Sequence, residues 1–163
     1  MSSARGLANQ KLYHAAILIR MLGAELAREE LPAARVLEAV GLAVRRHLLE
    51  AYGWFLLELA DVSELPAEPP SSIAELEQRY GRSDPRRGEL VELERLEGEG
   101  WLASLLAPPG RSRGSAASRA AGTAASGDLL AVAEQAWSRE GMALWHDSLA
   151  ELIDQMGHGL DEW

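Results

Sequence analysis

The sequence predicts an all-α fold, an up-and-down bundle of four to five helices in a single domain of residues 1–163. Apolar residues recur every three or four positions over most of the first sixty residues, whereas no segment shows the alternation of a half-buried strand. Proline and glycine residues mark the ends of the periodic segments. At 163 residues with 47% apolar residues, the chain is long enough to bury one continuous core.

The first predicted helix covers residues 9–29, NQKLYHAAILIRMLGAELARE. We expect Asn9 to cap its start, because an asparagine side chain accepts a hydrogen bond from the free N–H groups of a first helical turn. Pro32 then breaks the segment and suits the first turn of a second helix. The apolar positions of the first helix form a broad stripe, at Leu12, Ala15, Ala16, Ile19, Leu22 and Leu26.

The second predicted helix covers residues 32–61 and is apolar almost all round in its C-terminal half. Such a helix usually lies at the centre of a bundle, with Glu50 and Glu58 on the narrow remaining face. It is not expected to span a membrane. Its longest uncharged run covers only residues 51–57, whereas a spanning helix needs roughly 20 apolar residues, and buried glutamates would be costly in hydrocarbon.

Shorter helices are expected after a proline-rich linker at residues 63–72. Ser72 and Glu75 have the spacing of a capping box, which predicts a helix over 73–80 that ends at Gly81. Asp84 before a proline is another start signal.

The helix that Asp84 starts should be interrupted near Gly98 and Gly100. The next segment, WLASLLA at 101–107, predicts a short helix that ends before two prolines.

Residues 108–127, PPGRSRGSAASRAAGTAASG, are of low complexity and predict a long flexible loop within the domain. Residues 129–137 are apolar and ambiguous between helix and strand. Ser138 is positioned to cap a final helix that reaches about Met156. We expect this helix to lie, with the second one, at the centre of the bundle.

The net charge of −9, with a pI near 4.9, disfavours strong binding to nucleic acid or anionic lipid, which usually needs a basic face. The chain has no cysteine, which excludes disulfides, thiolate zinc sites, iron–sulfur clusters and a cysteine nucleophile. Its N-terminal residues show no apolar signal segment. These features favour a cytoplasmic protein with no membrane association.

Three segments, NQKLY, GELVELERLEGEGWLASLLA and WHDSLAELIDQMGHGLDEW, occur in this order along the chain. Together they resemble an uncharacterised family of small proteins from gammaproteobacteria such as pseudomonads and halomonads, classed as a domain of unknown function. The resemblance covers both ends and the middle of the chain and leaves out the loop at 108–127. It implies a small, soluble, helical bacterial protein, and it implies no activity, cofactor or functional residue.

His14, His47 and Glu50 are the candidate metal ligands. If the first two helices form an antiparallel hairpin that turns near residue 31, His14 and His47 share a layer, and Glu50 lies one turn beyond His47. Two imidazoles and a carboxylate suit a divalent metal. Carboxylate-bridged metal sites in bundles use more glutamates and E-x-x-H motifs, however, and this sequence has no E-x-x-H. The other interpretation is a hydrogen-bonded or half-exposed histidine pair.

Arg139 and His146 form an R-x6-H pattern in the final helix. Some helical ribonucleases of the toxin type carry an arginine that holds phosphate a few residues before a histidine that transfers a proton. Here Gly141 interrupts the pattern, and Asp147 adds a negative charge where phosphate would bind. The other interpretation is an exposed polar face beside Trp145.

The sequence therefore favours a non-catalytic cytoplasmic interaction or accessory protein that binds a protein partner or forms a homodimer. No glycine-rich phosphate loop, GxSxG or HExxH motif occurs, and no cofactor is expected. The second helix also carries a broad apolar surface that one short bundle is expected to leave partly uncovered. The alternatives are a metal-binding bundle that uses His14, His47 and Glu50, and a ribonuclease-like protein that uses Arg139 and His146.

Overall fold

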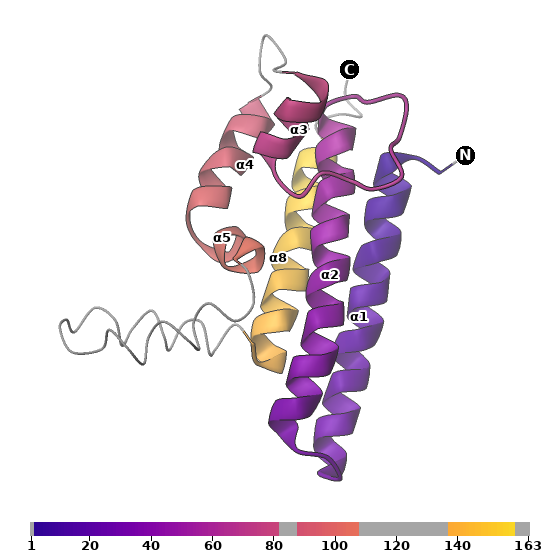
Figure 1. Cartoon of the computed structure of the whole chain (residues 1–163), viewed down its shortest axis with the longest axis vertical. Helices are drawn as coiled ribbons and strands as arrows, with labels where there is room; N and C mark the ends of the chain where they lie inside the picture. Colours follow the sequence, from indigo (N-terminus) through magenta and orange to yellow (C-terminus); the bar gives the residue numbers. More distant parts are fainter. Residues whose placement is uncertain (1, 82–87, 108–136, 159–163) are drawn as a thin grey trace, which may run out of the picture.

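The computed structural model describes residues 2–81, 88–107 and 137–158. These residues form six α-helices and no strand, which confirms the all-α prediction (Figure 1). None of the helices in the described ranges is long and apolar enough to cross a membrane. The helices are α1 (Ala4–Arg28), α2 (Ala33–Leu59), α3 (Ile73–Tyr80), α4 (Gly88–Gly98), α5 (Trp101–Leu106) and α8 (Arg139–His158).

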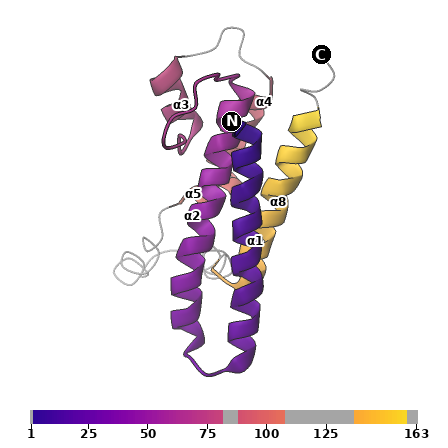
Figure 2. The ribbon, with the colours of Figure 1, turned by 90° about the vertical axis from the view of Figure 1, so that its right-hand side faces the viewer.

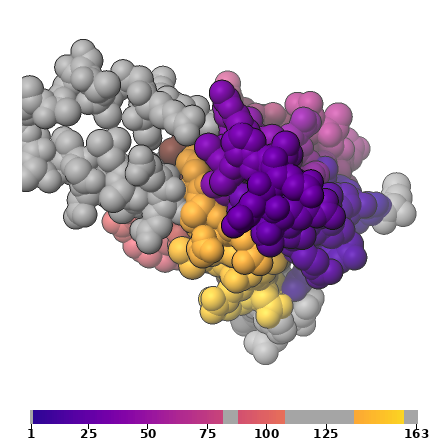
Figure 3. All heavy atoms as spheres, turned by 90° about the horizontal axis from the view of Figure 1, so that it is seen from below, coloured from indigo at the N-terminus to yellow at the C-terminus, as the bar shows by residue number. Residues whose placement is uncertain are grey.

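Three long helices, α1, α2 and α8, make up the body of the bundle. The first two form an antiparallel hairpin, and α8 runs beside both of them in the direction of α2 (Figures 1 and 2). The short helices α3, α4 and α5 each contact α2, and α5 also contacts α8. Seen from the end of the bundle that holds the α1–α2 turn, α8 lies alongside the hairpin (Figure 3), and it begins some way before the turn itself (Figure 1).

Helix α1 begins five residues earlier than predicted, and the assignment of Asn9 as its N-cap is wrong. The cap is Ser3, whose side-chain oxygen accepts a hydrogen bond from the Gly6 backbone N–H at 3.0 Å. Ala4 and Ala8 are both buried, so the extra turn adds to the core and extends the helix past the exposed Asn9. Pro32 is the residue directly before α2, which agrees with its predicted role as a break.

Helix α2 is the central helix, as its apolar C-terminal half predicts. Every residue from 51 to 57 is buried, and Phe55 is only 1% exposed. The expectation that the second helix would remain partly uncovered is therefore wrong for this half, whereas Leu42 in the N-terminal half is 47% exposed. The short helices α3, α4 and α5 supply the missing cover on the side away from α1, which helical periodicity in α2 alone does not reveal.

A single carboxylate joins α3 and α4 to α2. The phenol of Tyr52, fully buried in α2, donates to Glu97 Oε1 at 2.7 Å. The same oxygen accepts the backbone N–H of Ile73, the first residue of α3, at 2.8 Å. Glu97 of α4 thereby satisfies one buried hydroxyl and one free N–H at a helix start. Burial, followed by the nearby Glu97 charge, raises the pKa of Tyr52 far above its ordinary value.

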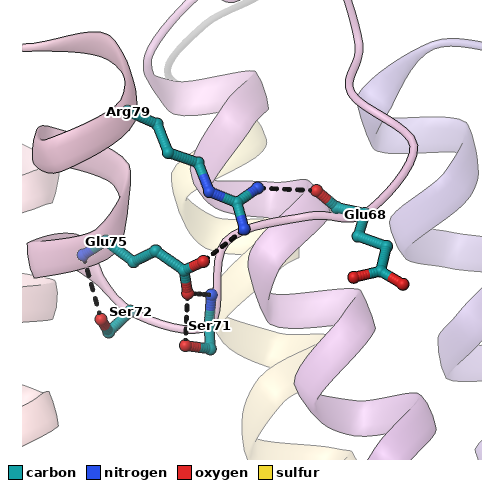
Figure 4. A network of polar contacts seen from close by, with 5 residues as sticks. All are labelled: Glu68, Ser71, Ser72, Glu75 and Arg79. Carbon is teal, nitrogen blue, oxygen red and sulfur yellow. Dashed lines mark hydrogen bonds and ion pairs between the residues drawn. The ribbon is translucent and has the colours of Figure 1, made fainter.

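The predicted start of α3 at Ser72 is confirmed. The backbone N–H of Glu75 donates to Ser72 Oγ at 3.2 Å, and the Glu75 carboxylate accepts from Ser71 N at 2.7 Å and Ser71 Oγ at 2.6 Å (Figure 4). Arg79, one turn later, pairs with Glu75 and donates to the Glu68 carbonyl at 2.8 Å. The capping network therefore ties α3 to the loop that leads into it.

Two further predicted helix boundaries are confirmed, and other predicted features lie outside the described residues. Gly100, with a φ of 84°, separates α4 from α5 as predicted. Ser138 caps α8, because its Oγ accepts the Gly141 N–H at 3.0 Å. The start signal at Asp84, the loop predicted at 108–127 and most of the ambiguous segment 129–137 lie outside the described residues.

Gly53 allows the loop between α2 and α3 to cross the buried face of α2. A β-carbon at this position would lie 2.1 Å from the Pro70 carbonyl oxygen and 2.9 Å from the Pro69 side chain. The contact involves backbone of a proline pair, which cannot rotate away as a flexible side chain would. The loop lies over the helix only because residue 53 has no side chain.

We predict that Gly53→Ala lowers the free energy of unfolding by roughly 1–3 kcal/mol, because the added methyl group overpacks the crossing. Urea denaturation followed by circular dichroism would measure this. The matched control is Gly98→Ala, at a helical position where a β-carbon meets nothing within 4 Å. It should leave stability unchanged or raise it slightly. Equal stability of the two variants would contradict the close crossing.

Candidate functional site

The α1–α2 hairpin brings His14 and His47 together, as the predicted register requires. Their ring centroids are 5.2 Å apart, and the rings meet edge to face with an interplanar angle of 73°. Both residues are half-buried in the seam between the two helices. The two histidines are thus in contact, as metal binding by the pair would require.

Glu50 lies in the same seam, where two cations engage its carboxylate. Lys11 of α1 forms an ion pair with Glu50, and Arg46 Nε donates to Glu50 Oε1 at 3.0 Å. Partial burial by itself would raise the pKa of Glu50, but hydrogen bonds from Lys11 and Arg46 outweigh burial, and the pKa is lowered. In this conformation the Glu50 carboxylate is occupied by Lys11 and Arg46. To bind a metal, Glu50 would have to break the ion pair with Lys11 or share one oxygen between Lys11 and the metal.

His47 has a buried ring nitrogen with no hydrogen-bond partner, Nδ1. Burial lowers the pKa of His47, and Lys11, His14 and Arg46 lower it further, while Glu50 opposes them. The imidazole is therefore neutral near pH 7, which is the form that ligates metals. An unsatisfied buried nitrogen is also what a metal ion or an ordered water would satisfy.

The described ranges nevertheless contain no group of three or more histidine, aspartate or glutamate side chains arranged to hold a metal ion. The structure brings His14 and His47 together and directs Glu50 toward Lys11 and Arg46. A metal at the histidine pair therefore stays a prediction, and Glu50 is its weakest member.

Arg139 and His146 do not converge on one site. They lie seven residues apart in α8, which corresponds to about 10 Å along the helix axis. The His146 Nδ1 atom is 3.0 Å from the neighbouring Asp147 carboxylate, so the negative charge predicted to oppose phosphate does lie against the histidine. Arg139 instead lies against Gly23 of α1, where a β-carbon would be 2.6 Å from its Nε.

Two features of the surface were not predicted from the sequence. The first is an open cavity of about 500 Å³ where the end of α1 meets the starts of α2 and α8, and Arg20 and Arg139 both line it. A signal for it exists in the sequence, since neither arginine has an acidic residue three or four positions away within its own helix.

The second feature is a row of exposed apolar side chains on the outward face of α1. Tyr13 is 67% exposed, Ile17 is 37% exposed and Met21 is 59% exposed. Their spacing of four residues places them one above another on a single face. The stripe toward the core dominated the periodicity of this segment and concealed the second, weaker row.

These features define a small helical-bundle protein with a polar seam between α1 and α2, an arginine-lined cavity and an apolar outer row. The chain belongs to the DUF6586 family, a family of unknown function whose sequence profile matches residues 1–163. No curated protein and no solved structure matched the chain.

We predict that His47 makes stability depend on pH. Its pKa in the folded protein lies below the ordinary 6.5, so the unfolded chain binds this proton more readily. The free energy of unfolding should rise with pH between the folded-state pKa and 6.5, and it should fall on acidification through that window. Urea denaturation between about pH 5 and about pH 8 measures the slope.

His47→Gln should flatten this part of the profile, because glutamine does not titrate. His146→Gln, in α8 and outside the α1–α2 seam, is the control and should leave the His47 contribution in place. A profile that is the same in wild type and His47→Gln would show that burial of His47 does not disfavour its charged form.

Proposed function

We propose that the protein is a non-catalytic interaction or accessory protein of the bacterial cytoplasm, and that it forms a homodimer through the outward face of α1. The observation that carries the proposal is the exposed row of Tyr13, Ile17 and Met21. Exposed apolar side chains gathered in one place, rather than scattered singly, are typical of contact surfaces. The ribonuclease-like alternative gains no support from the separation of Arg139 and His146 along α8.

The charge distribution favours a second copy of the chain as the occupant of this face. The chain carries a net charge of −9, yet its first acidic residue is Glu25. The only charged side chains of α1 before it are Arg5, Lys11 and Arg20, and Lys11 is paired with Glu50 across the α1–α2 seam. Two copies can therefore approach through α1 without bringing carboxylates together, whereas an approach through most other faces would bring like charges together.

The row is also self-complementary under a two-fold axis. Ile17 is its midpoint, and Tyr13 and Met21 lie one turn to either side. If two α1 helices cross antiparallel at Ile17, each Tyr13 meets the partner's Met21, and this is the isologous contact that closed dimers use. A methionine against an aromatic ring is a favourable pairing.

We predict that light scattering of the purified protein gives about twice the monomer mass of 17.7 kDa and that Ile17→Glu shifts the equilibrium to monomer. A charge buried without a partner at the centre of the contact should weaken association by at least about tenfold.

The matched control is Val91→Glu, because Val91 is 51% exposed in α4, on the other side of α2 from α1 (Figure 1). It should leave the mass unchanged. A wild-type mass near 17.7 kDa at micromolar concentration, or equal loss in both variants, would refute the α1 dimer.

The second candidate function is metal binding at His14 and His47, with Glu50 as a further ligand. The contact between the two rings and the unsatisfied His47 Nδ1 favour it. The ion pairs of Glu50 oppose it. Elemental analysis of protein purified without chelator or a histidine tag is the direct test.

If this site holds a metal, we predict stoichiometric metal in the wild type and a rise in melting temperature on addition of zinc, manganese or iron. His47→Ala should abolish both, whereas His146→Ala, which leaves the pair intact, should abolish neither. Absence of stoichiometric metal together with an unchanged melting temperature would exclude the metal-binding function.

A further inference from the structure

We propose that the cavity between α1, α2 and α8 binds a small organic monoanion, a carboxylate carried on a short apolar body. The cavity has a volume of about 500 Å³ and is open to solvent. This volume falls within the roughly 300–1,000 Å³ range of small-molecule sites. It lies at the end of the bundle that Figure 3 shows, away from the histidine pair in the middle of the hairpin.

The two arginines of the cavity differ from the other arginines of the described ranges. Arg20 and Arg139 both line the cavity, and neither has a hydrogen bond or an ion pair with another described residue. All other arginines in the described ranges donate to a carboxylate or a backbone carbonyl. They are Arg5, Arg28, Arg35, Arg45, Arg46, Arg79 and Arg95.

An exposed arginine without a partner is ordinary when it occurs alone. Here the chain has 25 acidic residues against 16 basic ones, so carboxylates are abundant. Arg20 and Arg139 nevertheless line the same cavity, and neither pairs with a carboxylate of the described residues, although Glu140 also lines it. Two cations that line one cavity repel each other, and an anion bound there would relieve that repulsion and could accept hydrogen bonds from both.

The backbone of α1 is adapted to this arrangement at Gly23. A β-carbon at position 23 would lie 2.6 Å from Arg139 Nε and 3.0 Å from its Cζ. The guanidinium of Arg139 therefore lies directly against the helix, at a position one turn beyond Arg20. Glycine lowers helix stability relative to alanine, and here it leaves the space in which Arg139 packs against α1 at the cavity that Arg20 also lines.

The charges of the cavity select a single negative charge. Arg20 and Arg139 contribute two positive charges, and Glu140, which also lines the cavity, contributes one negative charge. The remainder is one positive charge, which one carboxylate neutralises and a phosphate dianion would exceed. The first turn of α8 lies at the same wall, and its dipole adds a further attraction for an anion.

The other walls are apolar, and they determine the rest of the ligand. Ala24 and Ala27 of α1 and Leu37 of α2 line the cavity. Burying an alkyl group at such a surface is favourable and strengthens binding roughly fourfold for each buried methylene. A carboxylate with a short alkyl chain fits this cavity, because its carboxylate can pair with the arginines while its alkyl chain packs against the apolar side chains.

Isothermal titration calorimetry of the full chain with hexanoate at low salt tests the proposal. We expect saturable binding with one site per chain, weaker binding of acetate and no binding of hexylamine. Arg20→Gln and Arg139→Gln should each weaken hexanoate binding by about tenfold, the loss typical of one charge-assisted hydrogen bond. The control is Arg35→Gln in α2, where Arg35 pairs at the surface with Glu38 and does not line the cavity. It should bind as the wild type does.

Two further measurements test whether the alkyl chain contributes to binding and whether the cavity is independent of the dimer contact. Inorganic phosphate should bind more weakly than hexanoate, and Ile17→Glu should bind hexanoate as tightly as the wild type does. Circular dichroism checks that each variant is folded. No saturable hexanoate binding, equal binding by Arg20→Gln, Arg139→Gln and wild type, or phosphate binding as tight as hexanoate binding would overturn the proposal.

Discussion

The burial of the C-terminal half of α2 is the constraint on which the rest of the structure depends. Residues 51–57 are all buried, so this part of the helix needs cover on every side. Full burial of one leucine or phenylalanine side chain contributes about 1.5–3 kcal/mol, and several of them follow one another here. Helices α1 and α8 cover part of the surface of α2, and the short helices α3, α4 and α5 cover more of it. None of these three is long enough to be stable by itself.

Polar side chains from the long helices and from α4 keep the short helices in place. Arg45 of α2 donates to the carbonyl oxygens of Leu105 and Leu106 at 2.9 and 3.0 Å, and so it satisfies the last turn of α5. Glu97 does the same for the first N–H of α3. Each contact joins residues far apart in the sequence, so the covering helices are specified in position as well as in hydrophobicity.

Three parts of the protein outside the core differ in chemical character. The seam between α1 and α2 holds the pair of His14 and His47 beside the Lys11–Glu50–Arg46 ion pairs. Tyr13, Ile17 and Met21 form an apolar row on the outward face of α1. The cavity where the end of α1 meets α2 and α8 holds Arg20 and Arg139, which have no partner among the described residues. The separation of these three parts means that self-association, metal binding and anion binding involve different residues and can be tested one at a time.

The sequence by itself determined the helices, most of their ends and the placement of His14 and His47 in the same layer of the hairpin. These depend on local physics, on periodicity of 3.6 residues, on serine caps such as Ser72 and Ser138, and on the geometry of one short hairpin. Only the tertiary structure decided that the C-terminal half of α2 is covered on every side, that Glu50 pairs with Lys11, and that Arg20 and Arg139 line one cavity. Those outcomes depend on which faces of distant helices pack together, and many packings are compatible with the same periodic pattern.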